Sequence, residues 1–225
     1  MLRDLVIFGI GGMAREAHQI VEDLNALAPQ FNFLGFVDEN RANHGRDIHG
    51  FPVLGGIEWL EQYGHADLQV VIGVGNTAAR RKIVASVGQR CQVNFLKLVH
   101  PRAWIGHRVV IGDGAIICAD ARLTTDITIG NHVIVNVGAT VCHDSHIHDY
   151  VTISPSVNVS GAVHVGDGCD LGTGSAIIQG KKIGSWSIVG AGAVVINDVA
   201  CDVTVVGAPA KIIKTRQSGW HLGSE

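Results

Sequence analysis

Three histidines and two aspartates lie close together in the segment GATVCHDSHIHDY, residues 138–150. They are His143, His146, His148, Asp144 and Asp149. An imidazole with its usual pKa of about 6.5 can accept a proton at neutral pH, and in its neutral form it can bind a metal ion. The segment therefore has three candidate roles: a metal site, a general base with bystanders, or a solvated surface. The fold around these side chains decides among them.

The elements that must position these residues form a repeat of six. From Ile105 to Val195, every sixth residue is Ile, Leu or Val at all 16 positions. A second series, four residues further along each hexad, is small or β-branched except at Lys181. Each hexad predicts a short strand and a turn, and three hexads close one triangular coil of 18 residues. The repeat therefore predicts a parallel β-helix filled by aliphatic side chains.

The repeat also predicts where other side chains lie. His143 is expected to point outward near an edge of the prism, and His146 should stack on His164, which is 18 residues away. Glycine follows the inward residue in many hexads, and we expect it to permit the tight backbone of the corners. These glycines are Gly106, Gly112, Gly130, Gly166, Gly172, Gly184 and Gly190.

The first hundred residues have a different pattern, in which buried strands alternate with helices. Strands are predicted at Leu5–Phe8, in FNFLGFVDEN and in LQVVIG; helices are predicted from about Ala14, in GGIEWLEQYG and after GVGN, with only a short connection at FPV. This alternation indicates a small parallel sheet with its turns at the carboxyl edge. Gly9, Gly11 and Ala14 form a G-x-G-x-x-A motif that can offer backbone N–H groups to a phosphate. The same glycines can also serve only to pack a helix against a strand.

Composition and charge narrow the class of protein. The net charge is -3 and there is no basic run, which argues against nucleic acid as the main partner. No apolar stretch approaches the ~20 residues needed to cross a bilayer, and the opening MLRDLVIFGIGG does not have the pattern of a cleavable signal. The five cysteines contain no CxxC motif and indicate free thiols in a reducing compartment. We therefore expect a cytoplasmic protein without membrane insertion.

The hexads resemble those of the hexapeptide-repeat acyltransferases, which implies that the β-helix is left-handed. From Val6 to about Ile213 the chain resembles the nucleotide-sugar N-acetyltransferases and the sialic-acid O-acetyltransferase-like proteins of bacterial surface-glycan synthesis. This resemblance implies an α/β Rossmann-like domain at residues 1–100 that binds a nucleotide sugar. It also implies a left-handed parallel β-helix with a C-terminal cap at residues 101–225, which transfers an acetyl group from acetyl-CoA without a metal.

The same resemblance implies roles for particular residues. His143 would be the general base and Asp144 would orient it, while the Gly161 N–H would stabilise the oxyanion. The residues expected beside CoA are Gly161, Gly172, Thr173, Gly174, Gly190, Gly192, Ala208, Pro209 and Lys211. The residues expected to bind the nucleotide sugar are Gly9, Gly11, Gly12, Met13, Asp38, Gly75 and Asn76. Several sugar N-acetyltransferases have His where this chain has Met13, so O-acetylation of a sugar hydroxyl is an alternative to N-acetylation.

Two further alternatives have different chemistry. His107, His143 and His148 have the spacing of the zinc ligands in γ-class carbonic anhydrases, where three histidines and a water make an open catalytic site. A scaffold without catalytic activity would bind neither CoA nor a sugar nucleotide. The acetyltransferase resemblance implies a homotrimer with active sites shared between subunits. We expect its association surface to include the outward apolar residues Val110, Ile116, Ile134, Val137 and Val194.

Overall fold

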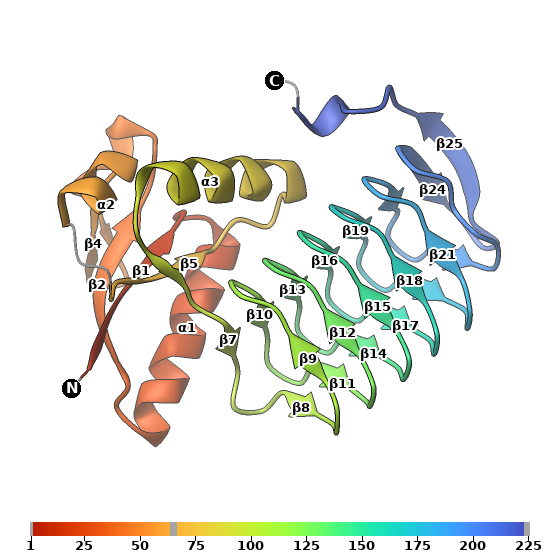
Figure 1. Ribbon diagram of the computed structural model, residues 1–225, viewed down its shortest axis with the longest axis horizontal. Coiled ribbons are helices and arrows are strands. Elements are labelled where there is room, and N and C mark those ends of the chain that lie inside the picture. The colour runs from red at the N-terminus through yellow and green to blue at the C-terminus, as the bar shows by residue number, and fades with distance from the viewer. Residues whose placement is uncertain (1, 64–66, 223–225) are drawn as a thin grey trace.

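The computed structural model describes residues 2–63 and 67–222, which form an α/β part followed by a long coil of short strands (Figure 1). The α/β part contains β1 (Arg3–Phe8), α1 (Gly12–Leu27), β2 (Phe31–Val37), the 3-10 helix η1 (Arg41–Asn43), β3 (Asp47–Ile48), β4 (Phe51–Gly55), α2 (Ile57–Tyr63), β5 (Gln69–Ile72), α3 (Thr77–Arg90) and β6 (Asn94–Phe95). The predicted fold class, an α/β part and a left-handed parallel β-helix, is confirmed.

The α/β part is built on one sheet with the strand order β3-β4-β2-β1-β5-β6. Its neighbouring strands are parallel except for the antiparallel pair β3 and β4. The prediction of only a short connection at Phe51 is wrong, because β4 pairs with β2 through Val53 and Phe36. A proline at the second position of this five-residue strand conceals it in the sequence.

Both faces of this sheet are covered, as expected for parallel strands. Leu5 and Ile7 of β1 pack in a cluster with α1. Val6 and Phe8 point to the other face and pack with residues of α2 and α3. The alternation of side chains along one strand thus divides the apolar residues between two cores.

The β-helix has three faces, each a sheet of stacked strands. The first face contains β7 (Leu98–Val99), β10 (Ile116–Ile117), β13 (Ile134–Val135), β16 (Thr152–Ile153), β19 (Asp170–Leu171), β22 (Ile188–Val189), β24 (Val203–Val206) and β25 (Lys211–Thr215). The second contains β8 (Trp104–Ile105), β11 (Arg122–Leu123), β14 (Thr140–Val141), β17 (Asn158–Val159), β20 (Ala176–Ile177) and β23 (Val194–Val195). The third contains β9 (Val110–Ile111), β12 (Thr128–Ile129), β15 (His146–Ile147), β18 (His164–Val165) and β21 (Lys182–Ile183).

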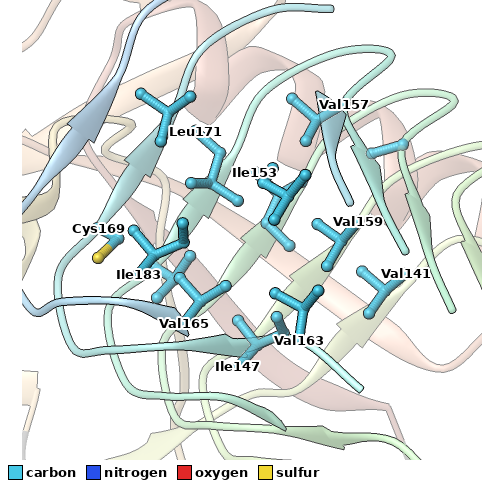
Figure 2. Packing of buried hydrophobic residues seen from close by; sticks show 14 of the residues in the cluster. Val141, Ile147, Ile153, Val157, Val159, Val163, Val165, Cys169, Leu171 and Ile183 are labelled. Atoms are coloured by element: carbon cyan, nitrogen blue, oxygen red, sulfur yellow. The ribbon is translucent and has the colours of Figure 1, made fainter. Parts of the chain in front are cut away.

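Partners in these sheets are 18 residues apart, as in the pair Ile117 and Val135, so one coil has the predicted length. Three edges join the faces. In the coil of Val135, the first edge is the turn Val137–Gly138, the second is His143–Asp144 and the third is Asp149–Tyr150. The inward aliphatic residues form one continuous core along the prism, part of which is shown in Figure 2.

The glycines that follow the inward residues have a different purpose from the one expected. Left-handed backbone angles occur at other positions of the turns, often at larger residues such as Arg108 (φ 57°), Asp144 (φ 60°) and Trp186 (φ 59°). A Cβ atom on Gly106 would instead collide with the carbonyl oxygen of Thr124 in the next coil. The close approach of stacked backbones therefore requires these glycines.

Two outward residues expected at a subunit surface are buried within the chain. Ile116 and Ile134 have no exposed surface, because the α/β part covers the start of the first face. They pack in the same cluster as Ala17 and Ile20 of α1. The prediction that they form an association surface is wrong, and these two side chains instead join the two parts of the chain.

The end of the chain returns toward the α/β part (Figure 1). After β25, which runs antiparallel to β24, the 3-10 helix η2 (Trp220–Leu222) contacts α3. The His221 ring stacks on Trp186 at the third edge, with ring centroids 3.6 Å apart. No helix in the described ranges has both the length and the apolar character needed to cross a membrane.

Candidate active site

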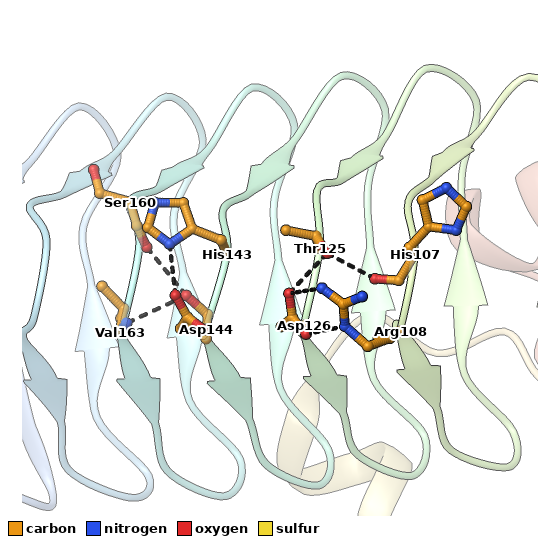
Figure 3. Close-up of polar contacts among 9 residues, drawn as sticks. His107, Arg108, Thr125, Asp126, His143, Asp144, Ser160 and Val163 are labelled. Carbon is orange, nitrogen blue, oxygen red and sulfur yellow. Dashed lines mark hydrogen bonds and ion pairs between the residues drawn. The ribbon is translucent and has the colours of Figure 1, made fainter.

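His143 and Asp144 form a pair on the second edge of the prism (Figure 3). His143 Nδ1 lies 2.8 Å from Asp144 Oδ2, and the two side chains are 51% and 65% exposed. An ionised carboxylate can only accept a hydrogen bond, so Nδ1 carries the hydrogen and the neutral ring keeps its free lone pair on Nε2. The pair can therefore remove a proton from a molecule that approaches from solvent.

Gly161 lies against the His143 ring, one coil further along. A Cβ atom at this position would be 2.5 Å from His143 Cε1 and 2.7 Å from Nε2, so only glycine leaves room for the ring. Among the described residues, the Gly161 N–H has no hydrogen-bond acceptor. This N–H beside the base can stabilise negative charge on a carbonyl oxygen.

A second carboxylate lies one coil before Asp144 on the same edge. Asp126 accepts hydrogen bonds from the Arg108 guanidinium and from Thr125 Oγ1, and these lower the pKa of its carboxyl to about 2 (Figure 3). The positively charged form of His143 also favours the ionised form of Asp126. The base is therefore close to two carboxylates, one of which is already paired with a cation.

Except for Gly161, which lies against His143, the residues predicted to lie beside CoA are on a different edge of the same chain. Gly172, Gly174, Gly190 and Gly192 lie at or beside the first edge, and the Ala208–Pro209 turn continues this edge toward the end of the prism. Gly174 and Gly192 adopt left-handed angles, with φ values of 68° and 67°. Thr173 and Lys211 are exposed there. Within one chain, the structure does not bring these residues together with His143.

The predicted nucleotide-sugar residues do come together at the carboxyl edge of the sheet. Gly9–Gly12 follows β1, Asp38 follows β2, and Gly75–Asn76 follows β5, which flanks β1 on the side opposite β2. Asp38 Oδ1 accepts hydrogen bonds from the backbone N–H of Asn40 and from Asn43 Nδ2, so it also organises the following loop. Met13 points partly into the core beneath α1.

The glycines at this edge serve two different purposes. Gly9 has a φ of 104°, and a Cβ atom on Gly73 would lie 2.6 Å from the Ala14 backbone, so the fold itself requires both. A Cβ atom on Gly11, Gly12 or Gly75 would meet nothing within 4 Å. The left-handed backbone therefore explains Gly9 and close packing against α1 explains Gly73, whereas the other three glycines border open space.

The N-termini of the two helices at this edge differ. Asn76 caps α3, because its side chain accepts a hydrogen bond from the backbone N–H of Ala79. Gly11 precedes α1 and provides no side-chain cap. The first backbone N–H groups of this 16-residue helix are therefore available to an anionic ligand.

The zinc interpretation needs His107, His143 and His148 on one ion. His107 and His143 share the second edge, whereas His148 lies beside the third edge. In the described part of this single chain, no three His, Cys, Asp or Glu side chains are grouped as a metal site. His146 and His164 stack as predicted, with ring centroids 4.9 Å apart.

Two residues near the candidate site were not predicted from the sequence. Arg80, in the first turn of α3, is 1% exposed and contacts the turn at Gly75. Thr152 of β16 contacts the same turn from the β-helix. The feature of the sequence that could have pointed to Arg80 is an arginine in the first turn of a predicted helix, where its charge opposes the helix dipole.

Comparisons with known proteins match both parts of the chain. The profile of the PglD N-terminal domain matches residues 4–87. GDP-perosamine N-acetyltransferase of Escherichia coli O157:H7 is 31% identical over 220 residues, which span 92% of this chain and 95% of that protein.

Solved structures match the same extent. A mutant of perosamine N-acetyltransferase from Caulobacter crescentus, in complex with CoA and GDP-perosamine, gives a TM-score of 0.85 at 29% identity and covers 95% of this chain and 98% of its own. The acetyltransferase domain of PglB from Neisseria gonorrhoeae, in complex with acetyl coenzyme A, gives a TM-score of 0.81 at 30% identity, with coverage of 95% and 100%. The similarity therefore includes the α/β part, the β-helix and their junction.

Proposed function

Because this chain belongs to the hexapeptide-repeat sugar acetyltransferases, we propose that it transfers the acetyl group of acetyl-CoA to the amino group of a nucleotide-linked amino sugar. That it is an acetyl-CoA-dependent acetyltransferase follows from its relatives. The observation that carries the proposal is the His143–Asp144 pair beside the free N–H of Gly161. The relatives named as GDP-perosamine N-acetyltransferases support an amine as the acceptor.

Each of these residues has one task in the reaction. Acetyl-CoA supplies the thioester, and the acceptor nitrogen must lose a proton to attack its carbonyl carbon. His143 Nε2 takes that proton, and Asp144 stabilises the resulting imidazolium through Nδ1. The Gly161 N–H donates to the carbonyl oxygen as negative charge develops on it. The imidazolium can then give the proton to the departing CoA sulfur, which restores the neutral base.

The acceptor's nucleotide is assigned to the carboxyl edge of the α/β sheet. Gly11, Gly12 and Gly75 border open space, and the uncapped N-terminus of α1 suits the negative charge of a diphosphate. Asp38, at the end of β2, is within the same edge and can accept hydrogen bonds through its carboxylate. A ligand that fills this edge would explain three glycines that the fold itself does not require.

The complete site is assigned to a homotrimer. The base lies on the second edge and the CoA-side glycines lie on the first, so a site that contains both needs two chains. Trp104 on the second face and Val110 and Val137 near its edges are 57%, 62% and 45% exposed, which provides apolar surface for association. Cyclic symmetry lets the second edge of each chain meet the first edge of the next.

A mixing experiment tests the shared site. His143→Ala removes the base, and Thr173→Trp blocks the first edge, so each variant alone should be inactive. If the two chains are co-expressed in equal amounts, about a quarter of the sites combine an intact base with an intact groove. Sedimentation should also give about three times 23.8 kDa. A fully active monomer, or mixed trimers without activity, would contradict this arrangement.

The reaction is tested by release of free CoA thiol in the presence of amino-sugar nucleotides. A thermal-shift screen of GDP-, UDP-, CMP- and dTDP-sugars first selects the acceptor, because a bound ligand stabilises the folded chain. His143→Ala should then lower turnover by about 10² to 10⁴ while the Tm is kept. Near wild-type acetyl transfer by this variant would refute His143 as the base.

We place the reaction in the cytoplasm, in keeping with the five free cysteines.

A further inference from the structure

Arg80 joins the α/β part to the β-helix through a dense set of hydrogen bonds. Its Nε donates to the carbonyl oxygen of His132 at 2.9 Å, and its Nη2 donates to the carbonyl oxygen of Tyr150 at 2.7 Å and to Thr152 Oγ1 at 2.9 Å. Its Nη1 turns back to its own domain and donates to the carbonyl oxygens of Val74 and Gly75, at 2.7 and 2.9 Å. The guanidinium therefore connects the turn after β5 with the third edge and the first face.

A charged arginine at this position lowers the stability of the fold unless its hydrogen-bonding groups are satisfied. Its side chain is 1% exposed, and burial lowers its pKa to about 10, which leaves it charged at neutral pH. It also lies in the first turn of α3, where the helix dipole disfavours a cation. A buried charge is tolerated when its hydrogen-bonding groups are satisfied, and every nitrogen of this guanidinium has an acceptor.

The network acts on one peptide group of the candidate acceptor site. Gly75 O accepts from Arg80 Nη1 and also from Thr152 Oγ1, each at 2.9 Å, so both of its lone pairs are used. This carbonyl points toward the β-helix. Because a trans peptide places C=O and N–H on opposite sides, the Asn76 N–H points away from the β-helix. Asn76 is exposed, and this N–H has no acceptor among the described residues.

We propose that Arg80 and Thr152 are positioning residues that hold the Gly75–Asn76 peptide, so that its free N–H binds the nucleotide part of the acceptor. The inference rests on the proposed function, because it assigns the acceptor to this edge of the sheet. It makes the β-helix, which carries the catalytic base, also responsible for the shape of the nucleotide site. These contacts lie away from the reacting atoms of both substrates. They nevertheless fix where the nucleotide sugar is held relative to His143.

The first face provides a matched control. Thr152, Asp170, Ile188 and Thr204 are successive partners in the register of the first face. Asp170 is the carboxylate whose charge favours the ionised form of Arg80. Thr204 occupies the same outward position as Thr152 on its strand, but its hydroxyl has no hydrogen-bond partner in the described part of the chain. The two threonines therefore differ in the contacts with Gly75 and Arg80 that the proposal uses.

The test compares Thr152→Val, Thr152→Ser and Thr204→Val in the full-length chain. The probe is the nucleotide-linked amino sugar selected by the thermal-shift screen, with GDP-perosamine tried first. Calorimetry without acetyl-CoA gives its Kd, and steady-state assays give its KM, the KM for acetyl-CoA, and kcat. Thr152→Val removes the hydrogen bonds that Oγ1 makes to Gly75 O and to Arg80 Nη2. It should raise the Kd and KM of the nucleotide sugar about fivefold, as expected if the ligand loses one hydrogen bond to the misplaced Asn76 N–H. Its kcat and its KM for acetyl-CoA should stay within twofold of wild type.

Thr152→Ser retains the hydroxyl and should restore the affinity, and Thr204→Val should match wild type. A free amino sugar without its nucleotide should be acetylated equally by all four proteins. An unchanged Kd in Thr152→Val overturns the proposal. So does an equal change in all kinetic constants, because a purely structural role would have that effect. If Thr152→Val does not fold, Arg80→Lys is used with the same expectations, and failure of both to fold overturns the proposal.

Failure of the proposed function and failure of the positioning role give different results. A wild-type chain that binds the nucleotide sugar but does not acetylate it refutes the proposed reaction, while the calorimetric comparison still decides the role of Thr152. A wild-type chain that acetylates the sugar and is unaffected by Thr152→Val refutes the positioning role alone.

Discussion

Replacement of Asp144 by Asn should lower kcat only about five- to tenfold, a much smaller loss than that caused by removal of a buried triad carboxylate. Asn is the suitable replacement, because Asp144 has a left-handed φ of 60°, which Asn tolerates and Ala does not favour. The change keeps the shape of the side chain and removes the charge that faces His143 Nδ1 across 2.8 Å.

The expected size follows from the exposure of the pair. His143 is 51% exposed and Asp144 is 65% exposed, so water screens the attraction between the imidazolium and the carboxylate. Two unit charges about 4 Å apart attract each other by about 1 kcal/mol in water, and partial burial raises this only modestly. About 1 to 1.4 kcal/mol of lost stabilisation in the transition state corresponds to a five- to tenfold lower kcat.

The assay is release of CoA thiol at saturating concentrations of both substrates, with KM values measured for each. Asp120→Asn is the matched control, because Asp120 also has a left-handed φ (58°) and pairs with an exposed cation, Arg102, but lies on the first edge. The control should retain wild-type kcat. A kcat for Asp144→Asn within twofold of wild type would refute the orienting role. A loss above about 10³ would refute the argument from solvent screening.

Three further changes test the packing of the site and of the core. Gly12→Ala fills open space in α1 and should raise the free energy of unfolding by about 1 kcal/mol, yet raise the KM of the nucleotide sugar about tenfold; an unchanged KM would count against phosphate binding there. Gly161→Ala puts a Cβ atom 2.5 Å from His143 Cε1 and should lower kcat about 10²-fold, whereas Gly88→Ala, which meets nothing within 4 Å, should retain wild-type kcat. Burial lowers the pKa of His132 to about 4, so the unfolded chain binds more protons below about pH 6.5 and stability falls as the pH is lowered. The free energy of unfolding, measured in urea, should fall by about 2 kcal/mol less between pH 7.5 and pH 5 in His132→Asn than in wild type. Equal decreases in the two proteins would contradict the burial argument.

Much of the fold could be predicted from the sequence because its signals are local and periodic. An inward aliphatic residue at every sixth position, such as Ile117 or Val135, determines the phase of the β-helix, and any other phase would expose the core. The same period placed His143 on an edge and Gly161 one coil beyond it, where the structure has them. Strand β4 is not predicted, because Pro52 at its second position conceals it and its register depends on pairing with β2.

The sequence by itself determined the repeat, the alternation of three main strands with three helices in the α/β part, and the residue types available for acetyl transfer. Only the tertiary structure decided which outward residues of the β-helix are covered. Ile116 and Thr152 occupy equivalent outward positions, but docking of the α/β part buries the first under α1 and turns the second into a partner of Gly75. The contacts of Arg80 with the β-helix join residues at least 52 positions apart, as in its hydrogen bond to the carbonyl oxygen of His132. Such contacts depend on how two separately formed surfaces meet, and a local period contains no information about that geometry.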